Sequence, residues 1–249
     1  MKLKNIIFAG CSVITVAALL YSCVKERGIE VAVESNDFSN KAFVQVFNAS
    51  VGTVRNYVYV DGKTLTGAVV PYGSSFPSVA STFTVSSGPH SFLIRDTLAS
   101  STQPQVAFAA NFDGKSSYTI FLYDTLALVK QITVKNEIVV PSDTTARVRL
   151  ANFVLSKTAA GSIDLYSISR KANVFSGVSV TGVTDYIPFA SRAVDSLIVR
   201  AAGTQVALDT LTFNPTAKRS YTLIFRGRYL TNEAGGAANP RVLSSFSTN

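Results

Sequence analysis

The feature that most constrains the fold is an internal repeat. Four sequence blocks recur in the same order at a nearly constant offset of 103 to 107 residues, so small insertions and deletions suffice to align them. The blocks begin at Ala42, Tyr57, Leu93 and Asn111, and their counterparts begin at Ala146, Asp164, Ile198 and Asn214. Four matched blocks in order are hard to reach by chance. The chain is therefore predicted to be a tandem duplication of a unit of about 100 residues.

Each unit is predicted to consist of β-strands. Short runs rich in Val, Ile, Phe, Tyr and Thr alternate with polar residues and are separated by turn dipeptides such as Asp61-Gly62. In the run 147–150, a period of two places Val148 and Leu150 in a core and Arg147 and Arg149 in water. Short strands without helical periodicity predict an all-β chain with two tandem antiparallel immunoglobulin-like β-sandwiches.

Composition changes along the chain give the domain boundaries. Residues 42–140 are predicted to form the first β-sandwich and residues 146–249 the second. The segment 141–145, Pro-Ser-Asp-Thr-Thr, is the linker, because Pro and small polar residues mark a boundary. Its shortness should limit the freedom of the two sandwiches. Residues 23–41 are interpreted as a flexible tether.

The N-terminus has the pattern of a secretory signal. Lys2 and Lys4 precede an apolar run at 6–21, which is shorter than the roughly 20 apolar residues of a spanning helix. The junction Leu20-Tyr21-Ser22-Cys23 resembles a bacterial lipobox. The resemblance implies that residues 1–22 are a cleaved lipoprotein signal peptide and that Cys23 carries a covalent lipid. The alternatives are ordinary signal-peptidase cleavage with a free thiol, and an uncleaved anchor.

Lipidation predicts a location. Two or three acyl chains give a stable membrane anchor, and Cys11 leaves with the leader, so the mature chain has no disulfide. Residue 24 is Val and not the Asp of an inner-membrane retention signal, while Lys25-Glu26 faintly resembles a surface-export signal of Bacteroidota lipoproteins. The expected location is the cell envelope at the outer membrane, in either leaflet.

The second unit resembles the uncharacterised domain family DUF 4397. The resemblance is carried by the blocks 146–149, 163–166, 183–186 and 218–222. In the first unit the block 57–62 fits, whereas a Ser-rich stretch at 73–76 replaces the block Val-Thr-Asp-Tyr. The resemblance implies a β-sandwich on an exported lipoprotein of Bacteroidota type. It brings no established activity and no active-site residues.

Few residues in the chain offer catalytic or metal chemistry. His90 is the only imidazole, and its place after Gly88-Pro89 predicts a solvated side chain at a hairpin tip, although a Ser-His-Asp triad would need it as base. No thiolate pair or His cluster exists for zinc. Three aspartates lie singly in turns, and Gly235-Gly236 does not open a helix, so neither calcium nor a phosphate loop is predicted. The aspartates are Asp61, Asp113 and Asp185.

Charge divides the two units. Residues 24–145 carry a net charge of −1, whereas residues 146–249 carry +7. A basic face attracts polyanions, and outside the cytoplasm an acidic glycan or lipopolysaccharide fits better than nucleic acid. The other interpretation, which we favour, is a solubilising face. The basic residues include Arg147, Arg149, Arg170, Lys171, Arg192, Lys218, Arg219, Arg226 and Arg228.

Aromatic residues also divide the units. Strand alternation turns six aromatics of the first unit outward, where the second unit has one. A contiguous patch of this kind is typical of a contact surface for the tether, the second unit, another protein or a sugar. A register error of one residue would turn the whole set inward. The six are Phe43, Phe47, Tyr57, Tyr59, Phe121 and Tyr123.

Tyr118 and Tyr221 open the penultimate strand of each unit, a placement similar to the tyrosine corner of immunoglobulin-like sandwiches. An ordinary core tyrosine is the alternative. Taken together, these patterns predict a non-enzymatic, membrane-anchored envelope lipoprotein that serves as a binding or structural module, with no metal and no cofactor apart from the lipid. The alternative function is an adhesin-like or glycan-binding module at the cell surface that uses the outward aromatics.

Overall fold

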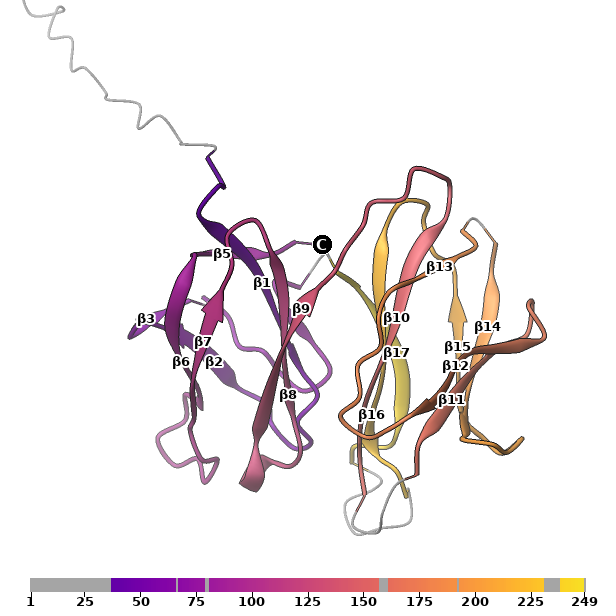
Figure 1. Cartoon of the computed structure of the whole chain (residues 1–249). Helices are drawn as coiled ribbons and strands as arrows, with labels where there is room; N and C mark the ends of the chain where they lie inside the picture. The colour runs from indigo at the N-terminus through magenta and orange to yellow at the C-terminus, as the bar shows by residue number, and fades with distance from the viewer. Residues whose placement is uncertain are drawn as a thin grey trace, which may run out of the picture. The chain divides into compact units, whose positions relative to one another are not determined.

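The computed structural model describes residues 37–65, 67–78, 81–156, 161–191, 193–230 and 238–248. Every regular element among them is a β-strand except one turn of 3-10 helix, η1 (Leu126–Leu128). The strands form four sheets (Figure 1). The all-β fold predicted from the alternation of apolar and polar residues is confirmed.

The first half of the described chain, residues 38–140, contains two sheets. Outer sheet 1 has the order β3–β2–β6–β7, and inner sheet 1 has the order β4–β1–β8–β9 with β5 also paired to β1. The strands of outer sheet 1 are β2 (Asn56–Val60), β3 (Lys63–Thr64), β6 (Gly88–Asp96) and β7 (Val106–Phe112). The strands of inner sheet 1 are β1 (Lys41–Asn48), β4 (Ser75–Phe76), β5 (Phe83–Ser86), β8 (Ser117–Tyr123) and β9 (Lys130–Asn136).

The second half, residues 146–248, also contains two sheets. Outer sheet 2 has the order β12–β11–β14–β15, and inner sheet 2 has the order β13–β10–β16–β17. The strands of outer sheet 2 are β11 (Ile163–Ser167), β12 (Ala172–Val178), β14 (Asp195–Ala201) and β15 (Ala207–Phe213). The strands of inner sheet 2 are β10 (Ala146–Leu155), β13 (Ile187–Phe189), β16 (Ser220–Arg228) and β17 (Val242–Thr248).

The pairing of strands follows the same plan in both halves. Strand β2 pairs with β6 so that Tyr59 lies opposite Leu93, and β11 pairs with β14 so that Tyr166 lies opposite Ile198. The named strands are antiparallel except for one parallel pair in each half, β1 with β8 and β10 with β16. A parallel pair needs a long crossover connection, and here four or more strands intervene. Sequence alternation does not reveal such a pair.

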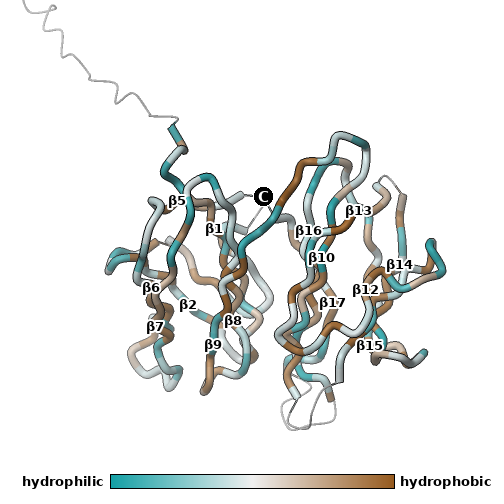
Figure 2. Tube along the Cα trace, viewed as in Figure 1, coloured by the Kyte–Doolittle hydropathy of each residue, from teal (hydrophilic) through white to brown (hydrophobic). Residues whose placement is uncertain are grey.

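A hydrophobic core fills the space between the two sheets of each half. In the first half, Val44, Val58 and Ile120 are fully buried, as their alternation predicts. In the second half, Val148 and Leu150 are fully buried in the equivalent core. Figure 2 shows that most of the strongly hydrophobic residues lie on strands. Burial of branched aliphatic and aromatic side chains is the main stabilising contribution in each half.

A third apolar cluster joins the two inner sheets, and we call it the seam. The rings of Phe121 and Phe153 lie 4.8 Å apart between centroids, and those of Phe47 and Phe246 stack at 4.6 Å. These contacts cross from the first half to the second, so the seam removes the outward faces of both inner sheets from water. The buried residues of the seam are Phe47, Ala49, Phe121, Ala151, Phe153 and Ile224.

Arg149 lies at the seam and not in water, so the sequence prediction for this side chain is wrong. Only 1% of the residue is exposed. Its Nε donates to the Thr222 hydroxyl at 2.9 Å, and its Nη2 donates to the Thr119 hydroxyl at 3.0 Å. Burial lowers the pKa of Arg149. Alternation located the face of β10 correctly, but a second sheet covers that face.

Candidate functional site

A hollow of about 430 Å³ opens beside outer sheet 1, where residues 97–105 connect β6 to β7. The hollow combines an aromatic ring, a guanidinium group and two amide side chains. This mixture of one apolar surface with several polar groups is typical of a site for a small polar ligand. Its principal lining residues are Tyr59, Arg95, Asp96, Ser101, Gln103 and Gln105.

Strand alternation places Tyr59 and Arg95 on the outward face of outer sheet 1. Their neighbours Val58 and Ile94 are fully buried in the core, so the next residue on each strand points the other way. The Arg95 Cζ lies 4.9 Å from the centroid of the Tyr59 ring, and Arg95 Nη2 donates to the Tyr59 hydroxyl at 3.3 Å. The two side chains therefore form one wall of the hollow.

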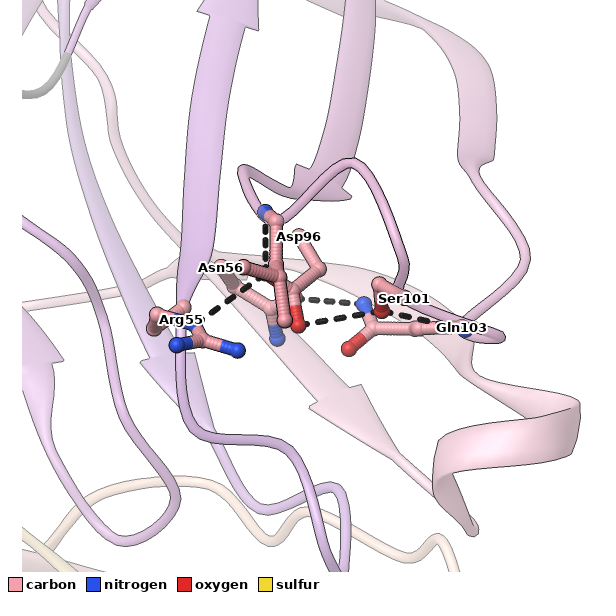
Figure 3. A network of polar contacts seen from close by, with 6 residues as sticks. Arg55, Asn56, Asp96, Ser101 and Gln103 are labelled. Atoms are coloured by element: carbon pink, nitrogen blue, oxygen red, sulfur yellow. Dashed lines mark hydrogen bonds and ion pairs between the residues drawn. The ribbon is translucent and has the colours of Figure 1, made fainter.

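Asp96 shapes the loop on the opposite side (Figure 3). Its Oδ1 accepts from the Leu98 backbone N–H at 2.8 Å and from Arg55 Nε at 3.4 Å, and its Oδ2 accepts from the Ser101 hydroxyl at 3.0 Å. Burial raises the pKa of Asp96, but the Leu98 N–H, the Ser101 hydroxyl and Arg55 outweigh it, so this pKa is lowered. The carboxylate stays ionised and holds the loop.

Two amide side chains, Gln103 and Asn56, meet next to this loop (Figure 3). Gln103 Nε2 donates to Asn56 Oδ1 at 2.5 Å, and the two residues are 7% and 0% exposed. Gln103 Oε1 and Asn56 Nδ2 are buried without a hydrogen-bond partner among the described residues. A buried amide group without a partner costs roughly 1–3 kcal/mol, and both atoms are closed off from the surface, since Asn56 lies outside the lining of the hollow.

The six outward aromatics of the sequence prediction do not form one patch. Tyr57 and Tyr59 lie on outer sheet 1, and the other four lie on inner sheet 1. Outward faces of two packed sheets point in opposite directions, so the two groups cannot meet. The four on the inner sheet are Phe43, Phe47, Phe121 and Tyr123.

Three aromatics of inner sheet 1 belong to the seam. Phe47 and Phe121 are 2% and 0% exposed, so neither can offer surface to a ligand. The ring of Tyr123 lies 5.4 Å from that of Phe153 across the seam. The ring of Phe43 lies 5.8 Å from that of Phe38. Among the six aromatics, Tyr59 lines the hollow and Tyr57 shares its outward face.

His90 is neither solvated nor at a hairpin tip, so this prediction is wrong. It lies within β6, and its side chain is only 10% exposed. Its Nδ1 lies 2.6 Å from Asp61 Oδ2, and its Nε2 lies 3.1 Å from the Ser86 hydroxyl. In space, the imidazole of His90 lies between a carboxylate and a serine hydroxyl, as in a Ser-His-Asp catalytic triad.

The second contact of His90 argues against such catalysis. Nε2 lies 2.8 Å from the backbone carbonyl oxygen of Ser86, closer than the hydroxyl. A carbonyl oxygen can only accept, so this contact requires a proton on Nε2, and a protonated Nε2 cannot take one from Ser86. The hydrogen bond from His90 lowers the pKa of Asp61. The cluster therefore ties β5, β6 and the β2–β3 turn together.

The described residues contain no group of three or more His, Cys, Asp or Glu side chains that could hold a metal ion. Asp61 bonds to His90, and Asp113 pairs with Lys135 Nζ at 2.9 Å. Asp185 is exposed in a connection between β12 and β13. Gly235-Gly236 lies outside the described residues.

The basic residues of the second half are distributed over several environments. Arg149 is in the seam, and the Cζ of Arg226 lies 4.8 Å from the ring centroid of Tyr72 in the first half. Arg170 lies over Phe189 with Cζ at 4.3 Å from the centroid. Lys171, Lys218 and Arg219 are exposed, Arg147 and Arg228 are half-buried, and Arg192 lies outside the described residues.

The hydroxyls of Tyr118 and Tyr221 make equivalent contacts in the two halves. Each accepts a hydrogen bond at 3.0 Å from a backbone N–H five residues upstream, that of Asp113 or that of Thr216. The Tyr118 hydroxyl also donates to Asp113 Oδ2 at 3.2 Å. Both residues therefore anchor the turn before their strand.

Sequence reasoning missed most of the polar groups at the hollow. The available signal was the length of one hairpin connection. In the first half, nine residues (97–105) join β6 to β7, whereas in the second half five residues (202–206) join β14 to β15. An extension in only one copy of a repeat indicates a local function. The missed residues are Arg55, Asn56, Arg95, Asp96, Ser101, Gln103 and Gln105.

The predicted signal peptide, Cys23 and most of the tether lie outside the described residues. Within the part of the chain that the structure describes, no helix is both long and apolar enough to cross a membrane.

Comparison with known proteins gives one family and several distant structural likenesses, two of which follow. The model of the family described as "Domain of unknown function (DUF4397)" matches residues 42–166, that is, the first half and the second as far as β11. No curated protein matches the chain. The match includes the first half, where the sequence blocks fit less fully than in the second.

Both structural likenesses are to carbohydrate-binding modules. CBMbc, a family CBM26 module from Eubacterium rectale Amy13K solved with maltoheptaose, has 11% identity and a TM-score of 0.27, covering 84% of this chain and 97% of its own. Family 41 modules from streptococcal virulence factors, which recognise alpha-glucan, have 7% identity and a TM-score of 0.23, covering 74% and 92%. Neither likeness bears on the ligand of this chain.

Proposed function

The chain belongs to the DUF4397 family, and from that premise we propose that it is a non-catalytic binding module whose hollow on outer sheet 1 takes a saccharide. Saccharides present many hydroxyl groups together with apolar C–H faces. The hollow offers amide groups and a guanidinium for the first and the Tyr59 ring for the second. A site of this composition fits a polar ligand with apolar faces.

The observation that carries the proposal is the lining of the hollow, where the Tyr59 ring and the Arg95 guanidinium lie beside the amide side chain of Gln105. The hydrogen bond between Gln103 and the fully buried Asn56 fixes the loop side of the hollow before a ligand arrives. Hydroxyl groups both donate and accept, so they can bond to an amide group and to the guanidinium together. Fixed groups of this kind add affinity because little ordering remains to be done on binding.

The test is retention of the full-length protein, purified in detergent, on an array of saccharides. We expect Tyr59→Ala to lose retention because the ring wall is gone. Tyr166→Ala is the matched control, because Tyr166 holds the equivalent position in the second half. Equal retention of wild type and Tyr59→Ala would contradict the proposal, as would no retention of the wild type.

We further propose that the module acts at the cell envelope as a lipoprotein, with a lipid on Cys23 anchoring it at the outer membrane. The lipobox-like junction at residues 20–23 supports this proposal. Cys23→Ser should abolish incorporation of a labelled fatty acid and leave the leader uncut. Continued labelling of the variant would exclude Cys23 as the lipidated residue.

A further inference from the structure

The charge of the hollow is not balanced. Its one carboxylate, Asp96, is fully engaged by Arg55, the Leu98 N–H and the Ser101 hydroxyl. The hydrogen bonds and Arg55 lower the pKa of Asp96 despite its burial, so it remains ionised and committed to the loop. Arg55 and Asp96 therefore neutralise each other, and neither charge is available to a ligand.

Arg95 is the remaining charge at the hollow. It is exposed, and the ion pairs found among the described residues do not include it. A guanidinium has five N–H donors in a planar fork, and the one bond described for Arg95 goes to the Tyr59 hydroxyl. The donors that remain match the two oxygens of a carboxylate or sulfate group.

Contacts with Tyr59 hold the Arg95 guanidinium in place. The ring lies under Cζ at 4.9 Å, and the hydroxyl accepts from Nη2 at 3.3 Å. Since the Tyr59 oxygen accepts from Arg95, its own O–H can donate to a ligand oxygen next to the guanidinium. An anion at this point would meet both donors at once.

In the second half, the equivalent residues Arg200 and Tyr166 lie closer together than Arg95 and Tyr59 do. Arg200 Cζ lies 3.7 Å from the Tyr166 ring centroid, and Arg200 is half-buried, with an Nε that is buried without a partner. The same two residue types thus stack face to face in the second half and stand more openly in the first. The open geometry occurs together with the long 97–105 connection.

We infer that the saccharide bound at the hollow is anionic and that Arg95 binds its carboxylate or sulfate group. This inference rests on the proposed saccharide-binding function and specifies its ligand. Arg95 and the Tyr59 hydroxyl select the charged group, while Gln105, an exposed amide in the same lining, binds a neighbouring hydroxyl. A neutral saccharide would leave the Arg95 donors facing water.

The test compares three oligosaccharides at pH 7 by calorimetry with the full-length protein in detergent. They are an oligouronate, its methyl ester, and a sulfated oligosaccharide of the same length. We expect the oligouronate or the sulfated oligomer to bind at least about tenfold tighter than the ester, since a charge-assisted hydrogen bond is worth about twice a neutral one. Whichever binds tighter identifies the anionic group.

Arg95→Gln should remove this preference, so that the charged oligomers bind the variant no more than about twofold tighter than the ester, because the amide keeps polar contact without charge. The matched control is Arg200→Gln, which should keep the preference. Equal affinity of wild type for the ester and for both charged oligomers would overturn the inference and leave the proposed function standing. Binding of none of the three would overturn both.

Discussion

The two outer sheets share strand order and register but differ at the positions that build the hollow. Asn56, Tyr57 and Asp96 in the first half correspond by register to Ile163, Asp164 and Ala201 in the second. The polar side chains of Asn56 and Asp96 are thus replaced by apolar ones, whereas the ring of Tyr57 is replaced by a carboxylate. The comparison indicates that the two halves share the frame of the sheet, and that the hollow is an elaboration of one half.

Asp164 shows what the second half does instead. It is 7% exposed, and its carboxylate accepts from the backbone N–H groups of Gly177 at 2.8 Å and Gly203 at 3.0 Å. The carboxylate therefore ties β12 and the β14–β15 connection to β11, where the first half has the half-buried ring of Tyr57. One position serves stability in one half and faces outward in the other.

The largest expected effect separates the seam from the outer sheets. Phe121→Ala should lower the free energy of unfolding by about 3–5 kcal/mol, because it leaves a cavity where both inner sheets meet. Denaturant unfolding measures this. Tyr59→Ala on outer sheet 1 is the control and should cost less than about 1 kcal/mol. Equal costs would mean that the seam adds little.

A loop exchange tests the comparison directly. Replacing residues 97–105 by the five residues 202–206 should weaken saccharide binding by at least about 100-fold, or about 2.7 kcal/mol, and leave the circular dichroism spectrum unchanged. The reverse exchange should not create binding, because the second half has Ile163 and Ala201 where Asn56 and Asp96 are needed. Binding by the reverse chimera would show that the loop alone suffices.

Acid should weaken the loop through Asp96. At pH 7, Asp96→Asn should cost about 1–2 kcal/mol of stability, because charged hydrogen bonds are lost. The folded pKa of Asp96 is lowered, so its contribution is present above the ordinary carboxyl pKa of about 3.9 and lost as pH falls through the folded value. The difference between wild type and variant should therefore shrink below about pH 4. A constant difference from pH 7 to 2 would refute this account.

The smallest effect concerns the two equivalent tyrosines. Tyr118→Phe and Tyr221→Phe should each cost about 1 kcal/mol in thermal unfolding, because each removes the acceptor of a backbone N–H. The cost should be larger for Tyr118, whose hydroxyl also bonds to Asp113 and which is only 6% exposed. A larger cost for Tyr221→Phe than for Tyr118→Phe would contradict the equivalent roles of the two tyrosines.

Features that depend on the alternation of residues within one strand, such as core positions, were predicted correctly from the sequence. The core positions Val44, Val58 and Val148 follow from a period of two, since each strand carries that information locally. The facing of Phe121 was also predicted, and the second unit, which covers it, was one of the four possible partners. Alternation says which residues share a face and nothing about the sheet that packs against it.

The hollow was only partly predictable for a similar reason. Tyr59 stands out as an outward aromatic, whereas Arg95 and Gln103 become partners of a site only when the 97–105 connection folds back. His90 was misplaced because Gly88-Pro89 has the composition of a turn, yet both residues belong to β6. Local composition gave the wrong result where strand pairing overrode it.

Arg149 has a consequence for how this protein can be divided. Its guanidinium donates a hydrogen bond to one threonine hydroxyl in each half. The seam phenylalanines are covered only while both halves are present. A fragment cut at residues 141–145 would expose the apolar residues of the seam to water. In the fragment of the second half, Arg149 would also lose the hydroxyl of Thr119. We therefore expect the smallest piece that can be transplanted to be the two halves together.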